Sequence, residues 1–207
     1  MKQILKNLQV KTIFSNFSNV HVVLCGQSAV IFDAGCQVEF VKTAVGNAKV
    51  EAIFLTHLHY DHVFYLMDYV NTFGCKVFLF NKRFVTNKNY TLENFIPLNL
   101  LLPKNCYESL ENIKLVNLNN FSVECFHTPG HSADSMCFKI ENCFFAGDTI
   151  FLNSIGRTDL FLGNSLEMKN SLNKIKNIKF EQCFSGHGKN STWEEQQKNI
   201  SYFLQIL

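Results

Sequence analysis

Arginine, proline and tryptophan are scarce in this chain of 207 residues, which contains two arginines, three prolines and one tryptophan. The formal net charge is only +2. Nucleic acids and anionic membranes are held by clustered basic side chains, and a balance so close to neutral does not predict such a surface. We therefore expect neither a nucleic-acid partner nor a membrane partner.

The sequence also lacks a long apolar run that could span a bilayer, and residues 1–14 lack the apolar core and cleavage site of a signal peptide. None of the eight cysteines forms a CxxC pair, and most lie in apolar, strand-like runs. This usage is typical of free thiols in a reducing compartment. We expect a cytoplasmic protein.

Composition and length are those of a globular protein. Hydrophobic residues make up 47% of the chain and charged residues 17%. A chain of this length can form one sizeable core, and no linker, low-complexity tract or tandem repeat divides it. We predict one domain over residues 1–207, with its oligomeric state left open.

Apolar periodicity predicts two β-rich halves with helices interspersed. The expected strands are 20–25, 29–33, 51–55, 76–80, 122–127, 136–140, 143–146 and 180–184, the first two forming a hairpin. The expected helices are 38–45, 63–73, 166–175 and 192–207, and residues 81–105 are predicted to be irregular. This order favours an α/β protein with two packed sheets covered by helices.

Ligand-type side chains are concentrated in one short segment, HLHYDH at residues 57–62, directly after an expected strand. Imidazole nitrogens together with a carboxylate suit zinc, iron or manganese. For this segment alone, the competing interpretation is a polar surface loop that contains histidine by chance.

Three more candidates stand at other strand ends, each beside a glycine. His131 lies in TPGH, Asp148 in GDT and His187 in GHG. Glycine lets the backbone turn sharply where a strand stops. Four strand ends that all carry ligand-type residues predict a shared metal centre.

The order HxHxDH, TPGH, GDT, GHG resembles the metallo-β-lactamase superfamily, and within it the glyoxalase II-like (hydroxyacylglutathione hydrolase-like) enzymes. The segments IFDAG at 31–35 and GRTD at 156–159 add to the resemblance, which extends from about Val20 to near the C-terminus. It implies an αββα sandwich of two mixed β-sheets flanked by helices, with metals at one edge. The implied ligands are His57, His59 and His131 for a first ion, Asp61, His62 and His187 for a second, and Asp148 for both.

The resemblance implies two divalent transition-metal ions, zinc first, with iron or manganese as alternatives. Two such cations can acidify a shared water to a hydroxide that attacks a carbonyl carbon. Asp61 would orient it and Asp148 would hold the cations together. We expect a hydrolase for a small acyl-thioester. The alternatives are a single-iron persulfide dioxygenase, another hydrolase such as a lactonase, or a protein without catalytic activity.

Some positions depart from the family pattern. Ala34 replaces a proline, and residues 63–66 read VFYL where relatives carry glycine. The chain ends soon after His187, whereas full glyoxalase II enzymes continue into a helical domain that contacts glutathione. We therefore expect little dependence on glutathione, with thiol recognition left to segment 81–105 and the loop around Arg157. The lysines that could add point charges there are Lys82, Lys88 and Lys104, although solvation alone is the favoured interpretation.

Other polar residues have weaker claims. Asp33 is expected to accept the N–H of a ligand histidine or only to cap a turn, and Thr56 could act similarly. Arg157 either binds an anionic part of the substrate or pairs with Asp159 to fix its loop, and we slightly favour the pair. Two histidines have no ligand position: His127 is expected to be buried and hydrogen-bonded, and His21 to pack in the core.

Overall fold

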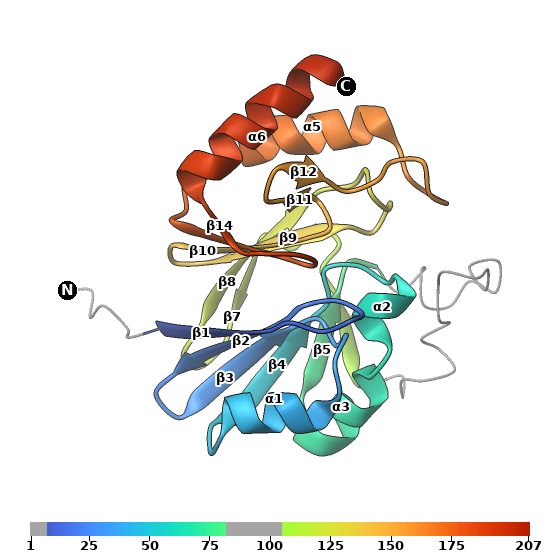
Figure 1. The fold of residues 1–207 in the computed structure, drawn as a ribbon. Coiled ribbons are helices and arrows are strands. Elements are labelled where there is room, and N and C mark those ends of the chain that lie inside the picture. The colour runs from blue at the N-terminus through green and yellow to red at the C-terminus, as the bar shows by residue number, and fades with distance from the viewer. Residues whose placement is uncertain (1–7, 82–104) are drawn as a thin grey trace.

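Two β-sheets pack face to face, and helices cover the outer face of each sheet (Figure 1). The computed structural model describes residues 8–81 and 105–207. The predicted αββα architecture is confirmed, whereas the prediction of a single domain over residues 1–207 stays a prediction. The lysines considered above, Lys82, Lys88 and Lys104, lie outside the described residues, as does most of segment 81–105.

The first sheet has the order β1-β2-β3-β4-β5-β6 and is mixed, because β1, β2 and β3 pair antiparallel and β3 to β6 pair parallel. Its strands are β1 (Leu8–Ile13), β2 (Val20–Cys25), β3 (Ser28–Phe32), β4 (Lys49–Phe54), β5 (Lys76–Leu79) and β6 (Tyr107–Ser109). The helices of this half are α1 (Val38–Val45), α2 (Tyr60–Val63) and α3 (Leu66–Phe73).

The second sheet has the order β14-β13-β10-β9-β8-β7 and is also mixed, since β10 and β13 run parallel among antiparallel pairs. Its strands are β7 (Leu115–Asn117), β8 (Ser122–His127), β9 (Met136–Ile140), β10 (Cys143–Gly147), β13 (Gln182–Ser185) and β14 (Ser191–Thr192). A small hairpin, β11 (Ile150–Phe151) and β12 (Ser154–Ile155), and helices α5 (Ser165–Ile175) and α6 (Trp193–Ile206) complete this half.

Aromatic side chains fill the space between the two sheets. Phe32 on the first sheet stacks on Phe145 on the second, with ring centroids 3.9 Å apart, and Phe54 and Phe138 pack beside them. All four side chains are fully buried. Each such burial contributes roughly 1.5–3 kcal/mol, so this layer holds the sheets at a fixed separation.

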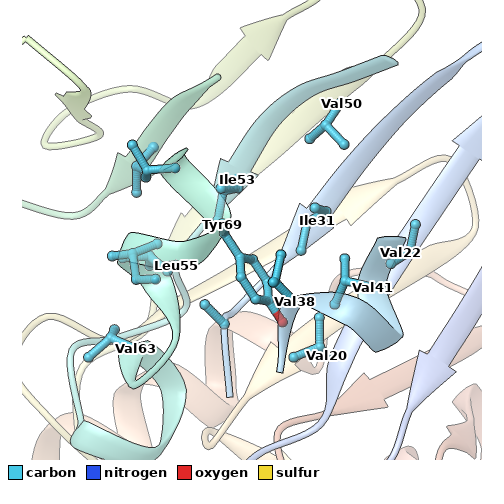
Figure 2. Packing of buried hydrophobic residues seen from close by; sticks show 14 of the residues in the cluster. Val20, Val22, Ile31, Val38, Val41, Val50, Ile53, Leu55, Val63 and Tyr69 are labelled. Atoms are coloured by element: carbon cyan, nitrogen blue, oxygen red, sulfur yellow. The ribbon is translucent and has the colours of Figure 1, made fainter. Parts of the chain in front are cut away.

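A second apolar layer lies between the first sheet and its helices. Figure 2 shows Val38 and Val41 of α1 and Tyr69 of α3 packing over Ile31 and Ile53 of the sheet. The spacing of apolar residues in 38–45 predicts this helix, and its bounds agree with the structure. The two helices therefore cover the outer face of the sheet at β3 and β4.

The predicted helix 63–73 is wrong in its first part, because α2 and α3 are separate helices. Phe64 and Tyr65 lie between them. The amide of Ala34 donates to the carbonyl of His62 at 2.8 Å, and the amide of Tyr65 donates back to the carbonyl of Ala34 at 3.0 Å. These two bonds with Ala34 take the place of a continuous helical ladder and fix the end of the HLHYDH segment against the turn after β3.

No helix within residues 8–81 and 105–207 is long and apolar enough to cross a membrane.

Candidate metal centre

Four strand ends converge at one edge of the two sheets. The segment 57–62 follows β4, and its last part forms α2, which is labelled in Figure 1. His131 follows β8, Asp148 follows β10 and His187 follows β13. The seven residues expected as ligands therefore come together from both sheets.

Their side-chain atoms lie close enough to share cations. Nε2 of His131 is 2.8 Å from Nδ1 of His59, and Nε2 of His62 is 3.2 Å from Oδ1 of Asp148. Three overlapping groups have all their ligand atoms within 4.8 Å of one another: His57, His59 and His131; His57, His62 and Asp148; and Asp61, His62 and His187. The first and third groups are the two sets of three implied by the sequence resemblance.

Three buried polar atoms of this cluster make no hydrogen bond within the described protein: Nε2 of His57, Nε2 of His62 and Oδ1 of Asp148. Burying polar atoms without hydrogen bonds costs free energy, and the ion pair of 3.2 Å between His62 and Asp148 leaves Nε2 of His57 unsatisfied. A cation bound between the three atoms would satisfy all of them. These donors are the nitrogen and oxygen ligands that zinc, iron and manganese accept. The residues present therefore fit a divalent transition metal.

Gly186 leaves the space in which these atoms meet. A Cβ atom at this position would lie 2.2 Å from Oδ1 of Asp148 and 2.6 Å from Cε1 of His62. Both distances are far below van der Waals contact, so a side chain here would push into the cluster. The GHG motif needs its first glycine for this reason.

Asp33 and Thr56, which are hydrogen-bonded to each other, contact the nitrogens of two histidines that face away from the cluster. Oδ2 of Asp33 lies 2.8 Å from Nδ1 of His62, and Oδ1 accepts from the amide of Thr56 at 2.8 Å. Oγ1 of Thr56 also donates to Asp33 and lies 3.1 Å from Nδ1 of His57. With Nδ1 engaged, each imidazole turns Nε2 towards the cluster.

Backbone atoms orient a third histidine. Nδ1 of His131 donates to the carbonyl of Arg157 at 2.9 Å, which leaves Nε2 for the cluster. The Arg157 side chain pairs instead with Asp159, through two hydrogen bonds of 2.9 Å, and both side chains are exposed. The local ion pair is thus present, and a role of Arg157 in substrate binding stays a prediction.

Burial and charge set the protonation states of the metal-free cluster. Burial lowers the pKa of His59 from 6.5 to about 4 and lowers that of His57 well below its usual range, so both are neutral and can bind a metal.

Burial would also lower the pKa of His187, but hydrogen bonds with Asp148 and Asp61 outweigh it and raise the value to about 9. Burial would raise the pKa of Asp148, yet the nearby His62 holds it well below its usual range. Since a protonated imidazole cannot bind a metal, binding at His187 should release a proton.

Neither of the two remaining histidines belongs to the cluster. Nε2 of His127 donates to the carbonyl of Ala133 at 2.9 Å, and its ring stacks on Phe80. His21 is buried and donates from Nε2 to the carbonyl of Ser185 at 3.2 Å. His21 packs in the core and His127 is hydrogen-bonded, as predicted, although His127 is only half-buried.

The sequence interpretation missed two residues that contact the site loops, Ser18 and Asn19. Both are buried and lie just before β2. The pattern before β2 shows only a polar pair at a strand start, which is common and carries no signal of its own. Their partners lie 43 and 166 residues further along the chain.

Comparisons with known proteins place the chain in one family. The sequence model of the Metallo-beta-lactamase superfamily matches residues 15–187. A probable polyketide biosynthesis zinc-dependent hydrolase of Bacillus subtilis is 26% identical over 172 residues, covering 81% of this chain and 71% of the relative. A hydroxyacylglutathione hydrolase of Tolumonas auensis is 28% identical over 202 residues, covering 96% of this chain and 70% of the relative.

A solved structure has the same fold. The crystal structure of the BLEG-1 B3 metallo-beta-lactamase superposes with a TM-score of 0.77 at 28% sequence identity, covering 94% of this chain and 99% of that one. The family model spans most of the chain and ends at His187 itself. The match therefore includes all seven clustered residues. The chain belongs to the metallo-beta-lactamase superfamily.

Proposed function

We propose that this protein is a metallo-hydrolase that binds two divalent transition-metal ions and cleaves a small acyl-thioester. Zinc is the favoured metal. The observation that carries the proposal is the group of three buried, unbonded atoms on His57, His62 and Asp148, which lies between the two outer groups. An arrangement with a shared central carboxylate suits two cations better than one.

The residues divide naturally between two ions. His57, His59 and His131 would hold the first, and Asp61, His62 and His187 would hold the second. Asp148 would contact both, since its carboxylate oxygens lie 3.2 Å from Nε2 of His62 and 3.5 Å from Nε2 of His131. When bound, the two cations supply an acidified water and polarise the carbonyl group under attack.

The chain's own residues then have defined tasks. Asp61 has an exposed fraction of 32%, so its carboxylate can accept a hydrogen bond from a water entering from solvent and orient it. Asp148 keeps the two halves of the cluster together by its negative charge. A thiolate leaving group departs without a strong general acid, so the hydrolysis needs no further proton donor.

Zinc and a thioester are supported by what the relatives are named for. The Bacillus subtilis relative is described as zinc-dependent and the Tolumonas auensis relative as a hydroxyacylglutathione hydrolase. A hydrolase with two ions is favoured over a single-iron dioxygenase because Asp61 and His187 remain in place, with Oδ2 and Nε2 3.0 Å apart.

A substrate panel on the zinc-loaded and iron-loaded protein tests this function. Acyl-thioesters, lactones, phosphodiesters and persulfides would be compared by product formation, with oxygen uptake followed for the persulfides. We expect thioesters to be turned over fastest. Oxygen consumption with a persulfide, and no thioester cleavage, would assign the protein to the dioxygenase class instead.

The thiol carrier can be tested in the same panel. The value of kcat/KM for S-lactoylglutathione would be compared with that for the lactoyl ester of a simpler thiol. We expect the two values to be similar. A preference for glutathione above about a hundredfold, roughly 2.7 kcal/mol in the transition state, would show a dedicated glutathione site.

A further inference from the structure

Two consecutive residues just before β2, Ser18 and Asn19, reach both sides of the second proposed metal site. Oγ of Ser18 donates to the carbonyl of Asp61 at 3.0 Å. The side-chain amide of Asn19 donates to the carbonyls of Ser185 and Gly188, each at 3.0 Å. These two residues therefore tie α2, which carries Asp61, and the loop that carries His187 to the segment that leads into β2.

Asn19 makes three hydrogen bonds to the loop that carries His187. Its backbone amide donates to the carbonyl of Gly186 at 2.7 Å, in addition to the two bonds from its side chain. Three hydrogen bonds thus surround His187, on the two residues before it and the one after it. An apolar residue of similar size could fill the space but could donate to neither carbonyl, and the bond to the Ser185 carbonyl is buried.

The two ligands concerned are those that burial does not fix. The side chains of His187 and Asp61 have exposed fractions of 40% and 32%, whereas His62 in the same group is 0% exposed. Packing and the contact with Asp33 hold the buried ligand in place, whereas the half-exposed side chains depend more on the backbone that carries them. Hydrogen bonds to that backbone therefore add a restraint on the gap between His187 and Asp61 to the direct contact of 3.0 Å between their side chains.

We propose that Ser18 and Asn19 are positioning residues for the second metal ion, acting by holding Asp61 and His187 at the distance at which both can bind it. The proposal rests on the two-ion site of the proposed function. Neither residue donates a hydrogen bond to His57, His59 or His131 in the described contacts. Replacing either residue should lower the affinity for the second ion and leave the affinity for the first unchanged.

The test is a metal titration of the metal-free protein, with Zn²⁺ followed by calorimetry and Co²⁺ followed by its visible absorption. Asn19→Ala and Ser18→Ala would be compared with the unmodified chain. We expect two binding events in each, with affinity for the second ion lowered about 10- to 100-fold in the variants and affinity for the first unchanged. The Co²⁺ absorption assigned to the second equivalent should change with it.

Asn199→Ala is the matched control. Asn199 is also buried, and its side-chain amide likewise donates to two carbonyls, those of Phe151 at 3.1 Å and Ser154 at 2.8 Å. Asn199→Ala should lower the stability of the fold by a similar amount without lowering the affinity for the second ion relative to the first. If thermal melting shows that Asn19→Ala does not fold, Ser18→Ala and Asn19→Ser are compared with the unmodified chain instead.

The outcomes separate this proposal from the function on which it rests. Two ions in the unmodified chain, with both affinities unchanged or both lowered equally in the variants, would overturn the positioning role and leave the two-ion hydrolase intact. A single ion in the unmodified chain would overturn both. A selective loss of the second ion in Asn19→Ala and Ser18→Ala, absent from Asn199→Ala, is the result that the proposal requires.

Discussion

Oδ2 of Asp33 lies 2.8 Å from Nδ1 of His62, and both side chains are buried. This contact keeps the proton of His62 on Nδ1 and leaves Nε2 to face Asp148. The second carboxylate oxygen of Asp33 accepts from the amide of Thr56, so the carboxylate cannot rotate freely.

Asp33→Asn should therefore impair metal binding although it conserves shape. The amide oxygen would face the N–H of Thr56, which turns the NH₂ group towards Nδ1 of His62 and favours the proton on Nε2. That tautomer cannot bind a metal, and we expect a loss of about 10- to 100-fold in affinity or activity. Asparagine tolerates the left-handed backbone at this position (φ 63°), so the variant should fold. Unchanged affinity would mean that this contact does not set the tautomer.

Two glycines of the GHG motif should respond differently to alanine. Gly186→Ala would place Cβ 2.2 Å from Oδ1 of Asp148, so we expect metal binding and activity to be lost. Gly188→Ala meets nothing within 4 Å and should cost only roughly 1–2 kcal/mol for its backbone at φ 72°. Metal content and thermal melting of both variants check this. Equal loss of metal in the two would point to a general effect on the loop.

Asp148→Ala should nearly abolish activity, whereas His127→Ala should leave most of it. Asp148 lies within 3.5 Å of three histidine nitrogens, and its loss should exceed the roughly 100-fold that removal of an outer partner costs. His127 only stacks on Phe80 and bonds a carbonyl. The measurement is kcat for both variants, with circular dichroism to establish folding. Comparable losses in two folded variants would overturn the ligand assignment.

His21 should make the metal-free protein less stable in mild acid. Burial lowers its pKa from 6.5 to about 4, although the hydrogen bond to Ser185 opposes this. The unfolded chain therefore takes up the proton first as the pH falls. The stabilisation is fully present above pH 6.5 and is lost between about pH 6.5 and 4, by about 3 kcal/mol at 1.36 kcal/mol per pKa unit.

Denaturant unfolding at pH 7 and pH 5 measures this effect, and His21→Gln is the comparison. Glutamine can still donate to Ser185 and accept from Thr12, which lies 3.1 Å from Nδ1 of His21, but it cannot take up a proton. The variant should lose less stability on acidification than the unmodified chain. An identical pH dependence would show that His21 titrates normally in the folded protein.

Much of the fold was predictable because its signals are local. Strands β8 and β9 and helix α1 have the predicted bounds, since their apolar periodicity ends at clear turn residues. The break between α2 and α3 was not predictable, because it depends on hydrogen bonds with Ala34, about 30 residues earlier in the chain. Strand β1 was missed as well, and only its pairing with β2 defines it.

For the candidate site too, the local sequence signals were predictable and the long-range contacts were not. Ligand-type residues stand directly after strands, so sequence order alone located the residues that cluster. The positions of Asn19 and Ser18 follow from contacts with distant loops, which no local pattern records. The sequence therefore indicates which residues meet, whereas the restraints on how they meet are visible only in the folded chain.

The number of metal ions per chain tests the central claim most directly. Metal-free protein would be reconstituted with excess zinc, freed of unbound metal and analysed for zinc against protein concentration. The three groups of ligands around His57, Asp148 and His187 predict two ions per chain. One ion or none, in a protein that is folded by circular dichroism, would contradict the account.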